Sequence, residues 1–291
     1  MEIGMKKILW LRKNYIRYAF KRLVEERFSP NFIITRVLQR LGISLPFVFK
    51  RYGLYLKMHP SATSLELYRG KRLIDADKFI IDTFVGPHSK CIDVGANIGH
   101  LSILMAKQAK EGFVIAIEPV PRIFSFMVEN IEINKVENII PINIAIDEKD
   151  GIKEFFYIKY SDDQSSFTIN EEKFVLKDVR KINVIALRLD KLLELLNIKS
   201  VDFLKIDVEG AELLVLKSLG DYIKSVKYIW FEFIEKNYSK FGYTLEDIIS
   251  FLNLNNFSLF KLNDNKQLTQ VLSPNELTGY MGNLLAINNQ F

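Results

Sequence analysis

From Cys91 onward, short apolar segments alternate with amphipathic ones, and this alternation restricts the fold more than any other feature of the chain. The pattern consists of apolar runs at 91–94, 113–118 and 139–146 and of helical spacing at 98–110 and 121–134. Strands that are apolar on both faces, each followed by a helix, are typical of a parallel sheet with helices on both sides. The sequence therefore predicts an α/β fold.

The same alternation continues in the last third of the chain, after a less regular middle. We expect helices at 190–197, 211–219 and near 245–255, and strands at 201–207, 227–233, near 257–262 and near 283–288. The middle contains two strand candidates, KEFFYIKY and KINVIAL, around a polar stretch. An insertion there would lie near the strand ends, where ligands bind in open α/β sheets. We therefore predict a substrate lid over 151–188.

Residues 1–60 come before this pattern and differ from it. Helical spacing at 5–28 and 29–42 predicts a pair of basic amphipathic helices. The stretch FVFKRYGLYLKM at 47–58 predicts a hairpin that turns at its Tyr-Gly pair. The sequence thus predicts a helical extension with a hairpin over 1–60 and a main domain over 61–291.

The positive charge of the chain is concentrated in its first 45 residues. Of the 40 Lys and Arg residues, ten lie there with only three Glu, although the net charge of the whole chain is just +5. We expect these helices to dock their apolar face on the main domain or on a second copy of the chain. Contact with a membrane through anionic lipid, or through a lipid-linked substrate, stays open. Nucleic acid is not expected, because aromatic residues are not interleaved with the charges.

Cysteine content and hydropathy bear on the compartment. The chain has a single cysteine, Cys91, so it forms no intramolecular disulfide and needs no oxidising environment. No apolar stretch approaches the roughly 18 to 20 residues that span a bilayer. The apolar run at 8–11 ends at Arg12, which is too short for the core of a signal peptide, about 7 to 15 residues. We therefore expect a cytoplasmic protein.

The stretch CIDVGANIGH, 91–100, is a strand that runs into a glycine-spaced loop. In the dinucleotide fingerprint G-x-G-x-x-G, the second glycine lets the backbone approach a pyrophosphate. Asn97 stands at that place here, between Gly95 and Gly99. Asp93 at the strand end would repel a pyrophosphate but attract the ammonium and sulfonium groups of S-adenosylmethionine (SAM). The loop therefore favours SAM, although Asp93 could instead only accept hydrogen bonds from the turn.

Glu118 ends the next apolar strand, about 20 residues after Gly99. A carboxylate at this position can accept hydrogen bonds from both ribose hydroxyls of a nucleoside. Glu118 thus indicates a ribose rather than one particular cofactor. The predicted SAM site consists of Asp93, Gly95, Asn97, Gly99 and Glu118.

A second group of charged residues lies in KIDVEGAE, 205–212. Methyl transfer to an alcohol needs a base or a metal, because an aliphatic hydroxyl is a poor nucleophile. Asp207 ends a predicted strand on the same sheet edge as the SAM site, and Glu209 follows it in the turn. We predict both as catalytic residues, and Glu232 in YIWFEF could join them. The cluster could activate a hydroxyl directly or hold a magnesium-like cation.

Two further charges in KIDVEGAE have simpler interpretations. Glu212 opens a predicted helix, where a carboxylate complements the helix dipole. Lys205 is expected to neutralise the neighbouring carboxylates.

Several of these motifs occur together in one known family. The stretches concerned are CIDVGANIG, VIAIEPVPRIFSFMVENIEIN, INVIALRLDKLL, VDFLKIDVEGAELLVL and YIWFEF. From about Leu65 to its end, the chain resembles the FkbM family of SAM-dependent methyltransferases. The resemblance implies a class I methyltransferase fold, a seven-stranded, mostly parallel Rossmann-like sheet with the last strand antiparallel. It also implies O-methylation of a hydroxyl on a sugar, glycan or related small molecule.

The resemblance also bears on three residues beside the predicted site. His100 stands where the family commonly has an aromatic residue, and it could shape the substrate pocket or relay a proton. Ser165 and Ser166 resemble a short family motif and could contact substrate. The first 45 residues fall outside the resemblance.

Two other functions stay open at this point. One is methylation of nucleic acid or protein, although the chain lacks the D/N-P-P-Y/F tetrapeptide typical of amino methylation of bases. The other is a non-catalytic partner protein that keeps the fold and docks through its basic helices. The acidic residues at working spacings favour an enzyme over the second.

Overall fold

The computed structural model describes residues 47–70, 74–158 and 179–291. The predicted helices at 5–28 and 29–42 lie outside the described residues. So does the centre of the predicted lid, with Ser165 and Ser166.

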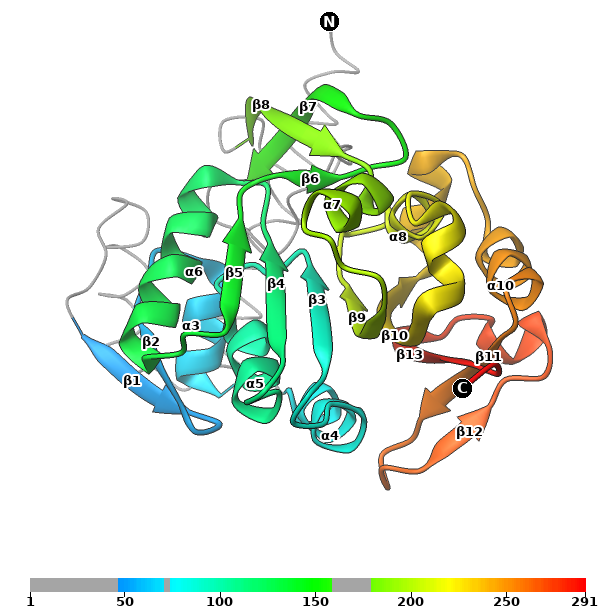
Figure 1. Cartoon of the computed structure of the whole chain (residues 1–291), viewed down its shortest axis with the longest axis horizontal. Coiled ribbons are helices and arrows are strands. Elements are labelled where there is room, and N and C mark those ends of the chain that lie inside the picture. Colours follow the sequence, from blue (N-terminus) through cyan, green and yellow to red (C-terminus); the bar gives the residue numbers. More distant parts are fainter. Residues whose placement is uncertain (1–46, 71–73, 159–178) are drawn as a thin grey trace, which may run out of the picture. The chain divides into compact units, whose positions relative to one another are not determined.

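The described residues form a main sheet of eight strands in the order β12-β11-β13-β10-β9-β3-β4-β5 (Figure 1). Its strands are β3 (Lys90–Val94), β4 (Phe113–Ile117), β5 (Ile139–Ile142), β9 (Val201–Ile206), β10 (Val226–Ile234), β11 (Phe257–Leu262), β12 (Leu268–Gln270) and β13 (Met281–Asn288). Neighbours from β10 to β5 pair in parallel, whereas β13 pairs antiparallel with β10 and β11. The predicted α/β fold with an antiparallel last strand is confirmed, and the short β12 adds a strand at the edge.

The apolar strands owe their composition to burial on both faces. Alternate residues of β4 enter two separate hydrophobic clusters, Ile115 and Ile117 in one and Val114 and Ala116 in the other. The first cluster packs under α7 (Leu189–Leu195), α8 (Glu212–Lys217) and α10 (Leu245–Leu254). The second packs under α4 (Asp75–Phe84), α5 (His100–Gln108) and α6 (Pro121–Asn134). Helices on both faces of a largely parallel sheet therefore account for the alternation in the sequence.

One predicted strand was wrong. The apolar run at 139–146 forms two strands in different sheets, β5 in the main sheet and β6 (Ala145–Ile146), which pairs with β8 (Val179–Leu187). Between them, the side chain of Asn143 donates hydrogen bonds to the carbonyls of Glu118 and Pro119 at 2.7 and 3.1 Å. Asn143 thus ties the point where the chain leaves the main sheet to the end of β4.

The two strand candidates of the predicted lid are confirmed as strands. β7 (Gly151–Ile158) pairs antiparallel with β8, and together with β6 they form a small three-stranded sheet (Figure 1). The role of 151–188 as a substrate lid stays a prediction.

The hairpin at 47–58 is also confirmed, as β1 (Val48–Arg51) and β2 (Leu54–Lys57). Its turn residues, Tyr52 and Gly53, have φ angles of +51° and +79°, the pattern of a type I′ turn. The hairpin lies in the compact unit Leu45–Phe291, and so with the main domain. A short helix, α3 (Ala62–Arg69), follows the hairpin and ends at Gly70, whose φ is +68°.

Asn130 connects this hairpin to the glycine loop. Its side-chain oxygen accepts a hydrogen bond from the Lys57 N–H at 3.0 Å, and its side-chain nitrogen donates to the Ile98 carbonyl at 2.9 Å. Asn130 is fully buried on α6, and so is its bond to the Ile98 carbonyl.

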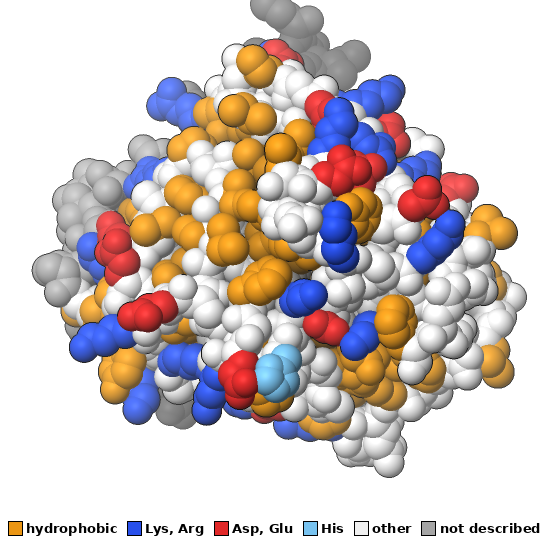
Figure 2. Space-filling model, in the orientation of Figure 1, with side chains coloured by type: hydrophobic (Ala, Val, Ile, Leu, Met, Phe, Trp, Pro, Cys, Tyr) orange, Lys and Arg blue, Asp and Glu red, His pale blue; other side chains and the backbone are white. Residues whose placement is uncertain are grey.

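No helix in the described part of the chain is long and apolar enough to cross a membrane. On the face shown in Figure 2, acidic and basic side chains are interspersed among the described residues.

Asn130→Ala should lower the free energy of unfolding by about 2–4 kcal/mol, because a buried carbonyl and a partly buried N–H lose their partners. Urea unfolding followed by circular dichroism measures the change. Ser125→Ala, on the exposed side of the same helix, is the matched control and should change stability by less than about 0.5 kcal/mol. Equal effects of the two substitutions would contradict the linking role of Asn130.

Candidate active site

Four neighbouring strands of the main sheet place the predicted residues at one edge. Asp93 lies in β3, Glu118 follows β4, Asp207 follows β9, and Glu232 lies in β10. These strands run parallel, so their carboxyl ends meet at the same edge, where ligands bind in such folds. The structure thus brings together the two groups of residues that the sequence separates by about 110 positions.

The glycine loop is built on left-handed backbone conformations. Gly95, Asn97 and Gly99 have φ angles of +81°, +52° and +79°. A Cβ on Gly95 would lie 1.9 Å from the carbonyl oxygen of Asp207, so only glycine allows the loop to approach the end of β9. Asparagine is among the residues that tolerate this conformation best. Asn97 therefore has the backbone conformation that glycine would otherwise provide.

Glu118 holds this loop in place. Its carboxylate accepts a hydrogen bond from the Asn97 N–H at 3.0 Å on one oxygen and from the Val120 N–H at 2.9 Å on the other. The sequence also predicts that this carboxylate accepts hydrogen bonds from a ribose. That contact stays a prediction.

Asp93 has its partners inside the protein. Its carboxylate is fully buried; one oxygen accepts a hydrogen bond from the Ser102 hydroxyl at 2.6 Å, and the other lies 3.4 Å from Lys205 Nζ. A protein cation therefore balances its charge. This geometry favours the interpretation of Asp93 as a structural acceptor over direct attraction to the charged groups of SAM.

Lys205 lies between two carboxylates. Its ammonium nitrogen is 3.4 Å from Asp93 and 3.3 Å from Asp207, and the side chain is almost completely buried. Burial lowers the pKa of Lys205, but the carboxylates around it, those of Asp207 and Asp93 foremost, raise the pKa more. The ammonium group therefore stays charged, as expected for a residue that neutralises its neighbours.

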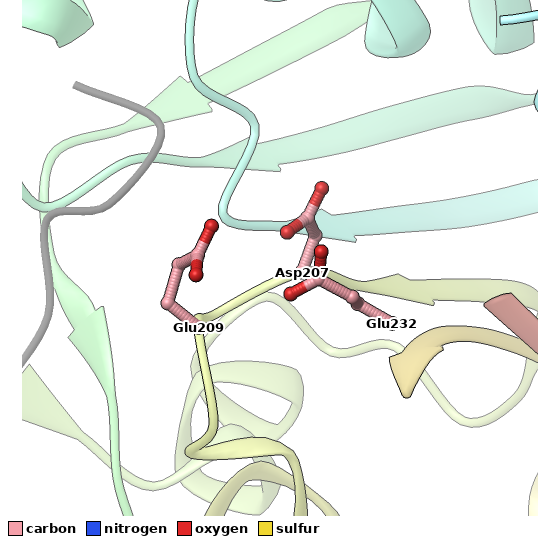
Figure 3. A group of neighbouring side chains, drawn as sticks. All are labelled: Asp207, Glu209 and Glu232. Carbon is pink, nitrogen blue, oxygen red and sulfur yellow. The ribbon is translucent and has the colours of Figure 1, made fainter. Parts of the chain in front are cut away.

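The predicted acidic cluster is present. One carboxylate oxygen from each of Asp207, Glu209 and Glu232 lies within 4.8 Å of the others, and Figure 3 shows the side chains converging from the β9–α8 loop and from β10. Burial first, and then the charges of Asp207 and Glu209, raise the pKa of Glu232 well above its usual range. Glu232 is thus expected to hold a proton at neutral pH, which relieves the repulsion in the cluster.

Three further residues, His100, Ser165 and Ser166, are predicted to lie beside the cluster. His100 is the first residue of α5 and is buried. Its role as a pocket residue or proton relay stays a prediction, as do the substrate contacts of Ser165 and Ser166.

Sequence reasoning missed how the turn between β9 and α8 is held. One carboxylate oxygen of Glu212 accepts hydrogen bonds from the Val208 and Gly210 N–H groups, both at 3.2 Å. The Tyr243 hydroxyl donates to the Gly210 carbonyl and receives a bond from the Leu213 N–H. Nothing near Tyr243 in the sequence signals this contact, because it joins residues about 30 positions apart.

Comparison with known proteins adds to this geometry. A family model described as the methyltransferase FkbM domain matches residues 93–259, more than half of the chain. The chain belongs to the FkbM methyltransferase family. The matched region contains both the glycine loop and the acidic cluster, and the resemblance seen in the sequence is confirmed.

"Methyltransferase 1" of Beauveria bassiana is 28% identical over 165 residues, which are 50% of this FkbM chain and 62% of that protein. A tRNA(Phe) (4-demethylwyosine(37)-C(7)) aminocarboxypropyltransferase of Methanocaldococcus jannaschii is 43% identical over 51 residues, 18% of this chain and 20% of that protein. The chain therefore spans less than two thirds of either relative. A solved FkbM methyltransferase from Methylobacillus flagellatus KT superposes with a TM-score of 0.42 at 15% identity, over 69% of this chain and 44% of that one.

Lys205→Met should lower the free energy of unfolding by about 3–5 kcal/mol, because Asp93 would stay buried without its counter-charge. Adding Asp93→Asn should restore part of the loss, since a neutral amide then replaces the orphaned charge. Lys227→Met is the matched control: Lys227 pairs with Asp202 at 2.9 Å but is partly exposed, so its loss should be below about 1 kcal/mol. Urea unfolding would contradict the central role of Lys205 if both lysine variants lost the same stability.

Proposed function

We propose that this FkbM domain transfers a methyl group from SAM to a hydroxyl of a sugar, a glycan or a related small molecule. The observation that supports the proposal is the close approach of Gly95 to the backbone carbonyl of Asp207, because the predicted cofactor loop then lies beside the acidic cluster. A second link joins the same elements, because the Asp207 N–H donates to the Val94 carbonyl at 3.0 Å. Cofactor and acceptor would then meet at one place.

The residues at this place fit SAM. Gly95, Asn97 and Gly99 form a left-handed loop at the strand edge, and the Glu118 carboxylate beside it could accept hydrogen bonds from the ribose hydroxyls. Bound there, SAM would supply an electrophilic methyl group on a sulfonium. The chain's own contribution would be to orient the acceptor oxygen and to remove its proton.

Asp207 is the residue best placed to remove that proton. It is half-buried, so its carboxylate can reach an acceptor, and Lys205 Nζ lies 3.3 Å away. The new bond would form between the acceptor oxygen and the methyl carbon while the carbon–sulfur bond breaks, and the hydroxyl proton would pass to Asp207. Glu209, beside it, would orient the acceptor hydroxyl.

A divalent cation is the alternative activator within the same proposal. Three carboxylate oxygens within 4.8 Å suit Mg²⁺ or a similar hard cation, and a bound cation would take the place of the proton on Glu232. Either route makes the acceptor oxygen more nucleophilic. Measuring activity after a chelator has removed any metal distinguishes the two routes.

The acceptor, the location and the partners of the chain are also proposals. The proposed acceptor is a free or lipid-linked hydroxyl compound, and the proposed location is the cytoplasm, with membrane contact or self-association through residues 1–45. Methylation of nucleic acid or protein is the alternative activity, and a non-catalytic partner protein is the alternative to an enzyme. Mass spectrometry of cell extracts incubated with deuterated SAM would distinguish these acceptors.

Glu118→Ala should weaken SAM binding about 10- to 100-fold, because the ribose would lose a charged hydrogen-bond acceptor and the loop would lose its anchor. Isothermal calorimetry with purified protein measures the dissociation constant. Glu137→Ala, an exposed residue away from the loop, is the control and should bind as the wild type does. The proposal fails if the wild type does not bind SAM at millimolar concentration.

Asp207→Asn should lower kcat about 100- to 1,000-fold and leave SAM affinity within about threefold, since the amide cannot accept the proton. Asp221→Asn, which changes an exposed carboxylate, is the control for turnover. The assay is repeated with a chelator present. Activity that survives chelation would mean that the carboxylate activates the hydroxyl. Activity that is lost with the chelator and restored by added Mg²⁺ would mean that a cation does. Normal turnover by Asp207→Asn would remove Asp207 from the mechanism.

A further inference from the structure

In the turn between β9 and α8, one of the three acidic residues, Glu209, has an unusual backbone conformation. Glu209 and Gly210 have consecutive positive φ angles of +56° and +107°. For a residue other than glycine this conformation costs about 1 kcal/mol or more, and it persists only where surrounding contacts enforce it. Glu209 therefore needs a specific restraint on either side.

Glu212 provides that restraint. One of its carboxylate oxygens accepts the N–H groups of Val208 and Gly210, the residues on either side of Glu209, both at 3.2 Å. The side chain is only 1% exposed, and its second oxygen is buried and makes no hydrogen bond among the described residues. A first-turn acid that only complemented a helix dipole would stay in solvent, so the burial of Glu212 has to be explained by the turn.

We propose that Glu212 is a positioning residue whose carboxylate clamps the Val208–Gly210 turn and so aims Glu209 at the acidic cluster. This inference rests on the proposed methyl transfer for its effect on turnover, but the clamp itself can be measured without it. Bonds from N–H groups to an ionised carboxylate are shorter and roughly twice as strong as those to a neutral acceptor. The clamp is therefore firmest when Glu212 is charged.

The groups around Glu212 disfavour the charged form of its carboxylate. Asp207 faces it from the same loop, Glu232 from β10, and Tyr238 and Tyr243 from the segment that follows β10. Burial first, and Asp207 with it, raise the pKa of Glu212 to about 7 against three backbone N–H bonds that lower it. Glu212 should thus change its charge in the range where the enzyme would work.

The stability consequence has a definite sign. Because the folded pKa lies above the unfolded value of 4.5, the folded protein binds more protons between about pH 4.5 and 7. Stability is therefore highest below pH 4.5 and falls as the pH rises through 7. Glu212→Gln, neutral and of the same shape, would lose this dependence and should be more stable than the wild type at pH 8.5.

The proposal requires that the same substitution slows the enzyme at that pH. At pH 8.5 Glu212→Gln should reduce kcat about tenfold, with the KM for SAM unchanged, because Glu209 is aimed less firmly. At pH 6 the wild-type residue is itself protonated, so the two proteins should turn over within about twofold of each other. A gain in stability combined with a loss of turnover, both confined to high pH, is not expected of a residue that only supports the fold.

The experiment compares the wild type, Glu212→Gln and Glu246→Gln at pH 6 and 8.5. Glu246 is the exposed first-turn acid of α10, so its substitution controls for the loss of a helix-dipole interaction. The measurements are kcat and KM, urea unfolding, and hydrogen exchange of the Val208 and Gly210 amides corrected for pH. Exchange in Glu212→Gln should be about tenfold faster than in the wild type at pH 8.5 and similar at pH 6.

Unchanged exchange of the two amides in Glu212→Gln at pH 8.5 would overturn the clamp. A loss of turnover that is the same at both pH values would overturn it too, because the charge of Glu212 would then be irrelevant. If the wild type shows no methyl transfer, the proposed function fails by itself. The exchange rates would then still decide whether Glu212 holds the turn.

Discussion

The ammonium group of Lys205 is buried between Asp93 and Asp207, and removing it from water costs several kcal/mol that those carboxylates must offset. The position of this ion pair in the sheet gives a reason for the desolvation cost. Asp93 is paired in register with Lys205 across β3 and β9, so the ion pair fixes the two strands whose ends carry the glycine loop and the acidic cluster. An apolar pair could hold the strands as well, but it could not place a positive charge behind Asp207.

Two close backbone approaches depend on the same alignment. Gly95 lies against the carbonyl of Asp207, and a Cβ on Gly210 would lie 2.8 Å from the Cβ of Asn237. Each glycine brings a loop nearer to its neighbour than any side chain would permit. The first contact joins the two halves of the site, and the second packs the acidic turn against the segment after β10. The site is therefore assembled by backbone contacts, and its charged side chains are added to a frame that is already fixed.

Local sequence patterns were sufficient to predict the helices and strands that carry the site. The α/β alternation and the start of α6 at Pro121 follow from periodicity and from the preference of proline for a first helical turn. The convergence of Asp207, Glu209 and Glu232 follows from the rule that parallel strands end at one edge. By contrast, the division of 139–146 between two sheets depends on the distant β8, and the turn beside Glu212 is held by the hydroxyl of Tyr243. Such contacts leave no local signal, so a dipole interaction was the natural but incomplete interpretation of Glu212.

The carboxylates of the site have different surroundings. Asp93 is neutralised inside the protein, Glu232 is driven toward its protonated form, and Glu212 is near balance at neutral pH. Asp207 alone combines partial exposure with a buried cation at 3.3 Å. Carboxylates whose surroundings push their pKa values apart can take different roles at one pH. Asp207 is therefore the proposed base, whereas Glu232 is expected to hold its proton, and a cation bound by both would remove this difference.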